Sequence, residues 1–484
     1  MIRILTTPVF GASWIVPGVV WTDTDGVKID AHGGGIFQHE NTFYWVGQGD
    51  GDNVTARMYS STDLLNWENR GLQSTVGGMW RPKLAKLEGG FRKLDMEIAL
   101  QYALDEGCWR IMVILVLILM SLQIYGQVSR HVQPLESTQI VGGYTITQPA
   151  VYLPPNNYSY SDTGIFRDDD GTWYLLTSAD HNTLQVNQIH TNGTIGARIN
   201  SLTGAPYEAP GMIKVDGIYF LIVSGKTAYA PNPNKMFWTT SINGTWTGPF
   251  DIAPNTTNTY DSQNSFELAV EGSECTTYVY MGDQFDATGS EESNYVWLPM
   301  AINSSAKTLT LEYHSMWKVN VSTGIVSFPT VAKRHEAEHA ELSGRAVGAD
   351  CEHCVSKRAV YGNCNWLVSR HSTVTFHNVT GTGSPQWMSF QYTVSNPKVA
   401  NLDYTTQSTN TLPPPHPAGE TYISINNHSV LKLSSLNSRA GYAKIVPVEV
   451  TLNRGDGNVV EFGAVGDEDF EVEIECLEVY EEES

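Results

Sequence analysis

The feature that most constrains the fold is a hairpin pattern that recurs along the chain up to about residue 330. In each copy a short apolar strand leads through a polar turn into a strand rich in aromatic residues. Two copies turn at Asp-Gly pairs, Asp170-Gly171 and Asp216-Gly217, and both residue types accept the positive φ of a tight hairpin turn. The pattern predicts an all-β chain made mostly of antiparallel hairpins.

The spacing of the hairpins suggests how they are arranged. They recur about every 45 to 50 residues where no insertion intervenes, a period typical of β-propeller blades. We expect residues 12–330 to form a β-propeller whose aromatic side chains mostly pack between blades. Residues 331–484 hold further short strands without helical periodicity, which predicts a β-sandwich. Two domains agree with the length of 484 residues.

Residues 87–124 do not fit their surroundings. They include Ile111–Leu122, an almost purely aliphatic run behind Arg110. A membrane span needs about 20 apolar residues, so the run is too short and we do not expect a membrane protein. We interpret residues 87–124 as an anomalous insertion of doubtful origin, with a buried helix as the alternative. Because it follows an Arg-Pro-Lys motif at 81–83, we expect it to interrupt the next strand of that blade.

Charge and sequons indicate the cellular context. Lys plus Arg number 29 against 51 for Asp plus Glu, a net charge of −22, so the chain lacks the basic surface that nucleic acids require. The 6 Cys fit an oxidising compartment. No signal peptide is evident in residues 1–20, yet we expect a secreted, extracellular monomer. Glycosylation sequons occur at Asn53, Asn157, Asn192, Asn243, Asn255, Asn303, Asn320, Asn378 and Asn427.

Two carboxylates precede two of the hairpins. Glu208 stands ahead of a Pro-interrupted turn and an apolar strand, where desolvation is expected to raise its pKa as a general acid requires. Asp162 has a similar place in its own hairpin, so the two are expected to meet at one face of a propeller. Two carboxylates directed at one sugar-sized space are the minimal equipment for glycoside hydrolysis. The alternative for Glu208 is a solvated surface residue.

The sequence around these residues resembles glycoside hydrolase family 43, and most of all its galactan 1,3-β-galactosidase branch. The resemblance covers residues 12–330 except the insertion. It is carried by motifs at 31–35 (Ala-His-Gly-Gly-Gly), 60–64 with Trp67, 81–83, 162–166, 168–171, 207–210 with Lys214, and 261–263. Each motif alone is weak, whereas the set is specific.

This resemblance implies a five-bladed β-propeller with its active site on the axis and an inverting mechanism. Glu208 corresponds to the general acid and Asp162 to the residue that orients it and tunes its pKa. The branch lacks the usual aspartate base, and Gln263 corresponds to the proposed partner of the attacking water. A neutral amide is a poor base, so positioning of water or a substrate hydrogen bond is the alternative role.

Several substrate contacts are also implied. His32 and Tyr229 are candidates, the latter as an aromatic residue that stacks on a galactose face. Gln48 and Trp80 occupy positions where the branch usually has glutamates. Loss of these two carboxylates weakens the case for the same substrate and for activity itself.

The C-terminal residues resemble carbohydrate-binding modules of family 35 or family 6. The similar pieces lie at 336–338, 342–344, 351–354, 374–379 and 469–472. The resemblance implies a structural Ca²⁺ ion held by Glu336, Glu338 and Asp469, with a solvated acidic face as the alternative. Trp366 and Trp387 are candidates for sugar contact, or else core residues.

The sequence therefore predicts a secreted enzyme that releases galactose from β-1,3-galactan, the backbone of plant-type arabinogalactan, without a cofactor for catalysis. A family 43 arabinofuranosidase or xylosidase and a non-catalytic sugar-binding propeller are the main alternatives. A third reading comes from 335–339, His-Glu-Ala-Glu-His, which matches the H-E-x-x-H pattern of zinc proteases. That reading requires these five residues to be helical.

Overall fold

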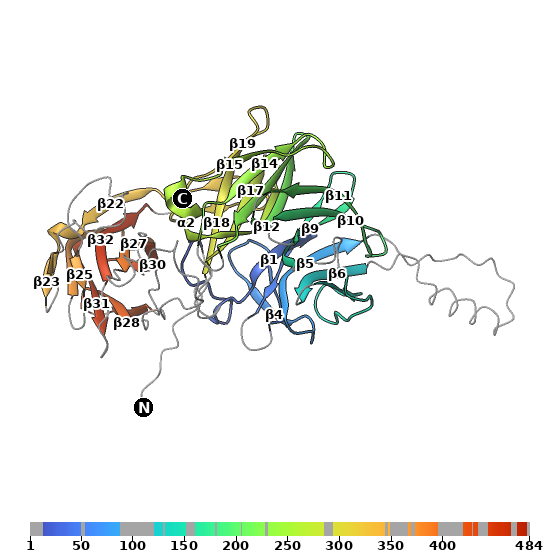
Figure 1. Cartoon of the computed structure of the whole chain (residues 1–484). Helices are drawn as coiled ribbons and strands as arrows, with labels where there is room; N and C mark the ends of the chain where they lie inside the picture. Colours follow the sequence, from blue (N-terminus) through green and yellow to red (C-terminus); the bar gives the residue numbers. More distant parts are fainter. Residues whose placement is uncertain are drawn as a thin grey trace, which may run out of the picture. The chain divides into compact units, whose positions relative to one another are not determined.

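The computed structural model of the chain (Figure 1) describes residues 13–49, 54–87, 121–128, 131–151, 160–179, 182–204, 206–227, 231–284, 294–343, 347–348, 366–368, 373–394, 420–427, 429–433, 444–465 and 472–481. The predicted all-β class is confirmed, because the helical pieces in these residues are only η1 (Asn255–Thr257), α2 (Asn258–Asp261) and η3 (Ala337–His339). The chain divides into two compact units, each described by itself.

The first unit is a series of antiparallel sheets, each built from consecutive strands. In the described residues there are five. They are β1–β4 (His32–His39, Thr42–Gln48, Ala56–Ser61, Glu68–Leu72), β5–β7 (Met79–Leu87, Ser121–Val128, His131–Ser137), β8–β11 (Tyr160–Arg167, Trp173–Ala179, Thr183–Ile189, Ile195–Thr203), β12–β15 (Tyr207–Val215, Ile218–Gly225, Lys235–Thr239, Thr247–Asp251) and β16–β19 (Gln263–Glu271, Thr276–Gln284, Asn294–Asn303, Thr308–Leu311). Later in the chain, and not part of these five sheets, β20 (Lys318–Val319) pairs with β21 (Val326–Ser327).

The hairpin turns predicted from Asp-Gly pairs are present. Asp216 and Gly217 have φ of 49° and 78°, and the pair Val215–Ile218 closes the β12–β13 hairpin around them. Gly171, with φ of 85°, lies in the turn between β8 and β9. These turns need residues that tolerate a left-handed backbone, which is the property that the sequence pattern offered.

The first strands of the five sheets contact one another in a closed ring. β1 contacts β5, β5 contacts β8, β8 contacts β12, β12 contacts β16, and β16 contacts β1. Buried apolar clusters join neighbouring sheets; one of them combines Phe166 and Leu176 with Met212 and Leu221. The ring brings the starts of the first strands together, and the candidate residues from sequence analysis lie at those starts.

Residues 87–124 do not interrupt their sheet, contrary to expectation. Ser121–Val128 forms β6, which pairs with β5 from Met79 to Leu87, so the last residues of the presumed insertion belong to the sheet. Leu87 pairs with Ser121, and the intervening residues 88–120 therefore replace the turn of a hairpin. The aliphatic run up to Met120 and the alternative of a buried helix lie outside the described residues.

The second unit contains two antiparallel sheets that share one apolar core. One sheet holds β22 (Val331–Glu336), β24 (Val347–Gly348), β25 (Trp366–Val368), β27 (Pro385–Val394), β30 (Lys444–Thr451) and β32 (Val472–Tyr480), and the other β23 (Glu341–Ser343), β26 (Thr373–Gly381), β28 (Glu420–Ile425), β29 (Ser429–Leu433) and β31 (Gly455–Val465). The core combines Phe390 and Leu477 of the first sheet with Phe376 and Phe462 of the second.

The second unit begins at Val326 and not at residue 331, and it also includes two earlier segments. Trp14–Val20 and His314–Lys318 belong to it, and Ile15 pairs with Trp317. The main division along the chain lies between Ile325 and Val326. Among the described residues, no helix is long and apolar enough to cross a membrane.

We predict that residues 88–120 can be replaced by an Asn-Gly turn without loss of stability. Leu87 and Ser121 are already paired, and a shorter connection reduces the entropy lost on closing the loop, by about 0.6 kcal/mol for each halving. The unfolding midpoint, followed by circular dichroism, should be no lower than that of the full chain. A clearly lower midpoint would mean that residues 88–120 contribute to the fold.

Candidate active site

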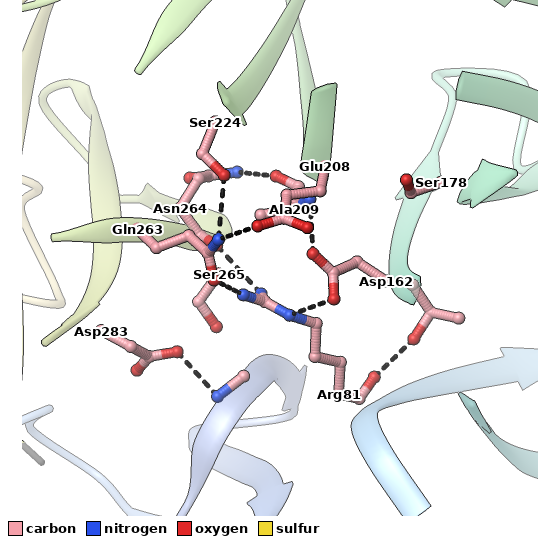
Figure 2. Close-up of polar contacts among 12 residues, drawn as sticks. Arg81, Asp162, Ser178, Glu208, Ala209, Ser224, Gln263, Asn264, Ser265 and Asp283 are labelled. Carbon is pink, nitrogen blue, oxygen red and sulfur yellow. Dashed lines mark hydrogen bonds and ion pairs between the residues drawn. The ribbon is translucent and has the colours of Figure 1, made fainter. Parts of the chain in front are cut away.

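Glu208 lies at the start of β12, in a distorted part of the strand. The pairing of β12 with β13 shifts register between Glu208 and Gly211, and Ala209 has a positive φ of 51°. Bulges of this kind redirect side chains and occur often beside active sites. The Glu-Ala-Pro sequence therefore places the Glu208 carboxyl within the ring of first strands, where Gln263 of β16 contacts it and Asp162 of β8 and Arg81 of β5 lie nearby (Figure 2).

Asp162 and Gln263 lie beside Glu208, as the sequence predicted. Gln263 donates from Nε2 to Glu208 Oε1 at 2.9 Å and to Ser224 Oγ at 3.0 Å. Asp162 Oδ2 accepts a hydrogen bond of 2.7 Å from the backbone N–H of Ala209, the residue next to Glu208 (Figure 2). The three predicted catalytic residues thus form one hydrogen-bonded group.

Arg81 connects this group, and sequence analysis missed its role. Its Nε lies 3.0 Å from Asp162 Oδ1, and its Nη1 donates to the backbone carbonyl of Asn264 at 3.0 Å. Its Nη2 donates to Gln263 Oε1. The available signal was the motif at 81–83, which sequence analysis used for the resemblance without assigning the arginine a function.

The electrostatic surroundings of Glu208 suit a general acid. Its pKa is raised to about 7, mainly by burial and then by the negative charge of Asp162, whereas Arg81, Lys226 and the hydrogen bond from Gln263 oppose the rise. A carboxyl with this pKa is largely protonated at mildly acidic pH and can give its proton to a leaving oxygen. The prediction of a desolvated carboxyl at this position agrees with the structure.

The contact between Glu208 and Gln263 is shorter than an inverting mechanism needs. Inverting glycosidases place their acid and base groups about 6.5 to 9.5 Å apart, so that sugar and water fit between them. Here Gln263 Nε2 lies 2.9 Å from Glu208 Oε1. A substrate that enters between the two side chains must break this hydrogen bond.

The candidate substrate contacts occupy different surroundings. His32 is fully buried and stacks on Tyr295, with ring centroids 4.8 Å apart. Gln48 is 3% exposed, and its Oε1 accepts from the backbone N–H of Arg81 at 3.1 Å. Both side chains therefore lie beneath the site in this structure, whereas Trp80 is 40% exposed. Tyr229 lies outside the described residues.

Several buried charges support the site, and sequence analysis did not assign them. Asp283 accepts from the backbone N–H of Gly33 at 2.7 Å, and burial raises its pKa to about 6. Lys83 donates to the Gly33 carbonyl, and burial lowers its pKa to about 7. Glu267 is buried on β16 beside Gly211. Their polar character gave no signal, because strands of propellers often carry exposed charges.

The second unit does not gather the predicted Ca²⁺ ligands within the residues that the structure describes. Glu336 pairs with Arg334 at 2.7 Å, Glu338 lies 3.7 Å from His339, and Asp469 is outside the described part. In the described ranges, no group of three or more His, Cys, Asp or Glu side chains could hold a metal ion. Because Asp469 lies outside the described part, the calcium site stays a prediction.

The other predictions for this unit have separate outcomes. His335 and Glu336 end strand β22 and Ala337–His339 form one short 3₁₀ turn, so the zinc-protease reading, which needs an α-helix, is wrong. Trp387 packs against the buried cluster of Trp14 and Tyr480, which favours a packing role. For Trp366 the structure describes the strand but not the side chain.

Comparison with known proteins places the whole chain beside a group of solved structures. No protein-family model and no curated protein matches it. The exo-β-1,3-galactanase Pc1,3Gal43A of Phanerochaete chrysosporium is 26% identical with a TM-score of 0.71, over 96% of this chain and 100% of that one. It was crystallised with β-1,3-galactotriose, as variants of one glutamate, and with galactose.

A second solved structure supports the fold alone. The exo-β-1,3-galactanase 1,3Gal43A of Clostridium thermocellum is 23% identical, with a TM-score of 0.55 over 75% of this chain and 81% of that one. Similarity at this level concerns the fold and not the substrate. The full-length similarity to the Phanerochaete enzyme and the desolvated carboxyl of Glu208 together identify an enzyme of the glycosidase class.

We predict that Glu267→Gln makes stability less dependent on pH. Burial raises the pKa of Glu267 from 4.5 to about 8, so its proton stabilises the folded state and this contribution is lost as the pH rises between those values. Glu208 and Asp283 act in the same direction, whereas Lys83 opposes them above about pH 7. The free energy of unfolding of the variant should fall less from about pH 5 to about pH 8. This free energy is measured by urea titration at each pH, and an equal fall with pH in both proteins would contradict the prediction.

Proposed function

We propose that this chain is a family 43 glycoside hydrolase that releases galactose from the end of β-1,3-galactan by inverting hydrolysis. The observation that carries the proposal is the group formed by Glu208, Asp162 and Gln263 at the starts of three neighbouring first strands. The full-length similarity to an exo-β-1,3-galactanase supports the substrate. The ring of five sheets supports a five-bladed propeller with its site on the axis.

In the proposed mechanism Glu208 gives its proton to the oxygen of the leaving sugar. Asp162 keeps the pKa of Glu208 high through its negative charge and holds the adjacent backbone through the Ala209 N–H. Water attacks the anomeric carbon from the opposite face as the bond to the leaving oxygen breaks, and the proton that the water loses passes to solvent. Gln263, released from Glu208 by the incoming sugar, orients that water by a hydrogen bond, and no cofactor takes part.

The alternatives differ in what they require of the site. A family 43 arabinofuranosidase or xylosidase would share the acid and differ in the contacts to the sugar, where exposed Trp80 replaces a usual glutamate. A non-catalytic sugar-binding protein has no need of a carboxyl with a pKa near 7 beside a second carboxylate. The intact group around Glu208 therefore favours catalysis.

The second unit and the sequons support an extracellular role. Two sheets around a common core agree with a β-sandwich carbohydrate-binding module that keeps the enzyme on a plant-type polysaccharide. The sequon asparagines in the described ranges are all exposed, as glycan attachment requires: Asn192, Asn243, Asn255, Asn303, Asn320, Asn378 and Asn427. We therefore propose a secreted glycoprotein.

We predict that Glu208→Gln lowers galactose release from β-1,3-galactan by about 10²- to 10⁴-fold, because the leaving oxygen loses its proton donor. Hydrolysis of 2,4-dinitrophenyl β-galactoside should fall far less, since that leaving group departs without protonation. Both rates are measured by release of product. Glu271→Gln, at the exposed far end of the strand that carries Gln263, is the matched control.

The same assay separates the alternatives. Release of arabinose or xylose from arabinan or xylan, with none from galactan, would replace the proposed substrate. Binding of galactan without release by the full chain and by the variant lacking residues 88–120 would replace the enzyme with a binding protein. Equal loss of both galactoside activities in Glu208→Gln would contradict the acid role.

We predict that the chain carries N-linked glycans when it is made in a eukaryotic secretory host. Treatment with an N-glycosidase should lower its mass, and peptide mass spectrometry should find occupied sites among Asn192, Asn243 and Asn303, which lie at exposed positions. Retention in the cell without glycans would contradict secretion. Asn→Gln at single sites gives the control for each peptide.

A further inference from the structure

Arg81 is held at its backbone as well as at its side chain. It has a positive φ of 49°, which is uncommon for a residue other than glycine, and strained residues of this kind cluster at functional sites. Its backbone N–H donates to Gln48 Oε1 at 3.1 Å, and its carbonyl accepts from Thr163 Oγ1 at 2.7 Å. The guanidinium thus starts from a fixed point on β5 and reaches across the ring (Figure 2).

The chemistry of the guanidinium determines how its neighbours are oriented. It carries only donors, so every atom it contacts must be an acceptor. Gln263 therefore turns Oε1 toward Arg81 and leaves its NH₂ group facing Glu208 Oε1 and Ser224 Oγ. If the Gln263 amide were turned the other way, its NH₂ group would face the N–H groups of Arg81, and Glu208 would lose the hydrogen bond that Gln263 donates.

The contact with Asp162 fixes the opposite side of the acid. Arg81 Nε lies 3.0 Å from Asp162 Oδ1 and pairs with it. The other carboxylate oxygen, Oδ2, is therefore available to accept a hydrogen bond of 2.7 Å from the backbone N–H of Ala209. Ala209 is the residue that follows Glu208 in the bulge, so this hydrogen bond sets the direction in which the Glu208 side chain leaves the strand. The Arg81 side chain is 5% exposed, and little water competes for these contacts.

We propose that Arg81 is the positioning residue of the site, whose guanidinium orients Gln263 and holds Asp162, which aims the Glu208 carboxyl through the Ala209 N–H. This inference rests on the proposed function, in which Glu208 is the acid. A lysine cannot replace the arginine fully, because a single ammonium lacks the planar fork that reaches three acceptors at once.

The charge of Arg81 gives the proposal a readout that a purely structural role would not move. The charged groups that face Glu208 are Asp162 from β8, Arg81 from β5 and Lys226 after β13. The positive charge of Arg81 lowers the pKa of Glu208, so its removal should raise that pKa above about 7. Removal of the negative charge in Asp162→Asn should lower it.

The experiment compares the wild-type chain with Arg81→Ala, Arg81→Lys and Asp162→Asn. The titration of Glu208 is followed by NMR of side-chain ¹³C-labelled glutamate, with Glu208→Gln to assign the signal, and this needs no substrate. Turnover of β-1,3-galactan is measured against pH in parallel. Arg167→Ala, an exposed arginine at the far end of the strand that carries Asp162, is the matched control.

In Arg81→Ala we expect the Glu208 midpoint to rise by about one pH unit and kcat to fall by about 10²-fold, as expected of a misplaced catalytic group. KM should change little. Arg81→Lys should keep the midpoint near that of the wild type and lose about tenfold in kcat, since it keeps charge without geometry. Asp162→Asn should shift the midpoint downward.

Other results would overturn the proposal. These are an Arg81→Ala variant with the wild-type midpoint and kcat, a loss confined to KM, or full activity in Arg81→Lys. If Arg81→Ala does not fold, the activity of Arg81→Lys alone decides between the proposal and its rejection. If the wild-type chain releases no galactose, the proposed function fails, while the NMR titrations still test whether Arg81 controls Glu208.

Discussion

The close approach of neighbouring first strands is the constraint on which the site depends. A Cβ atom at Gly164 on β8 would lie 2.0 Å from the backbone oxygen of Pro210 on β12. A Cβ atom at Gly211 on β12 would lie 2.0 Å from the carboxylate of Glu267 on β16. Only glycine permits the first distance, which is to backbone, whereas a Cβ atom at position 211 would displace the buried Glu267 carboxyl. Because the strands come so close, side chains at their starts reach one another by direct hydrogen bonds.

The same closeness creates the electrostatic character of the site. Polar side chains inside the ring lose most of their contact with water, and a charge without water is costly unless it is paired. Burial accordingly raises the pKa of Glu208, Glu267 and Asp283 and lowers that of Lys83. Burial is therefore the main reason that Glu208 holds its proton at mild pH. It shares a low-dielectric environment with its neighbours, and Arg81 and Asp162 adjust the pKa from there.

Sequence patterns predicted those parts of the structure that are encoded locally. The Asp-Gly turns depend on the two residues at the turn, so the hairpins around Gly171 and Gly217 were predictable. Glu208 and Asp162 were found because each precedes such a hairpin. The functions of Arg81 and Asp283 depend instead on contacts between sheets that are distant in sequence, and no local pattern reports them. For the same reason sequence analysis missed the pairing of β5 with β6, two strands that are separated in the chain by residues 88–120.

Gln48 and Trp80, which differ from the family that the sequence resembles, have different physical meanings. Gln48 is buried and accepts from the backbone N–H of Arg81, a task that an amide oxygen performs as well as a carboxylate. A charged glutamate there would need a further partner, since an unpaired buried charge is costly. The exchange is thus compatible with an intact acid group. Trp80 is exposed, so its replacement of a carboxylate changes the surface offered to a ligand and not the support of Glu208. We therefore expect a change in substrate preference to trace to Trp80, whereas the proton donation proposed for Glu208 depends on its burial within the ring.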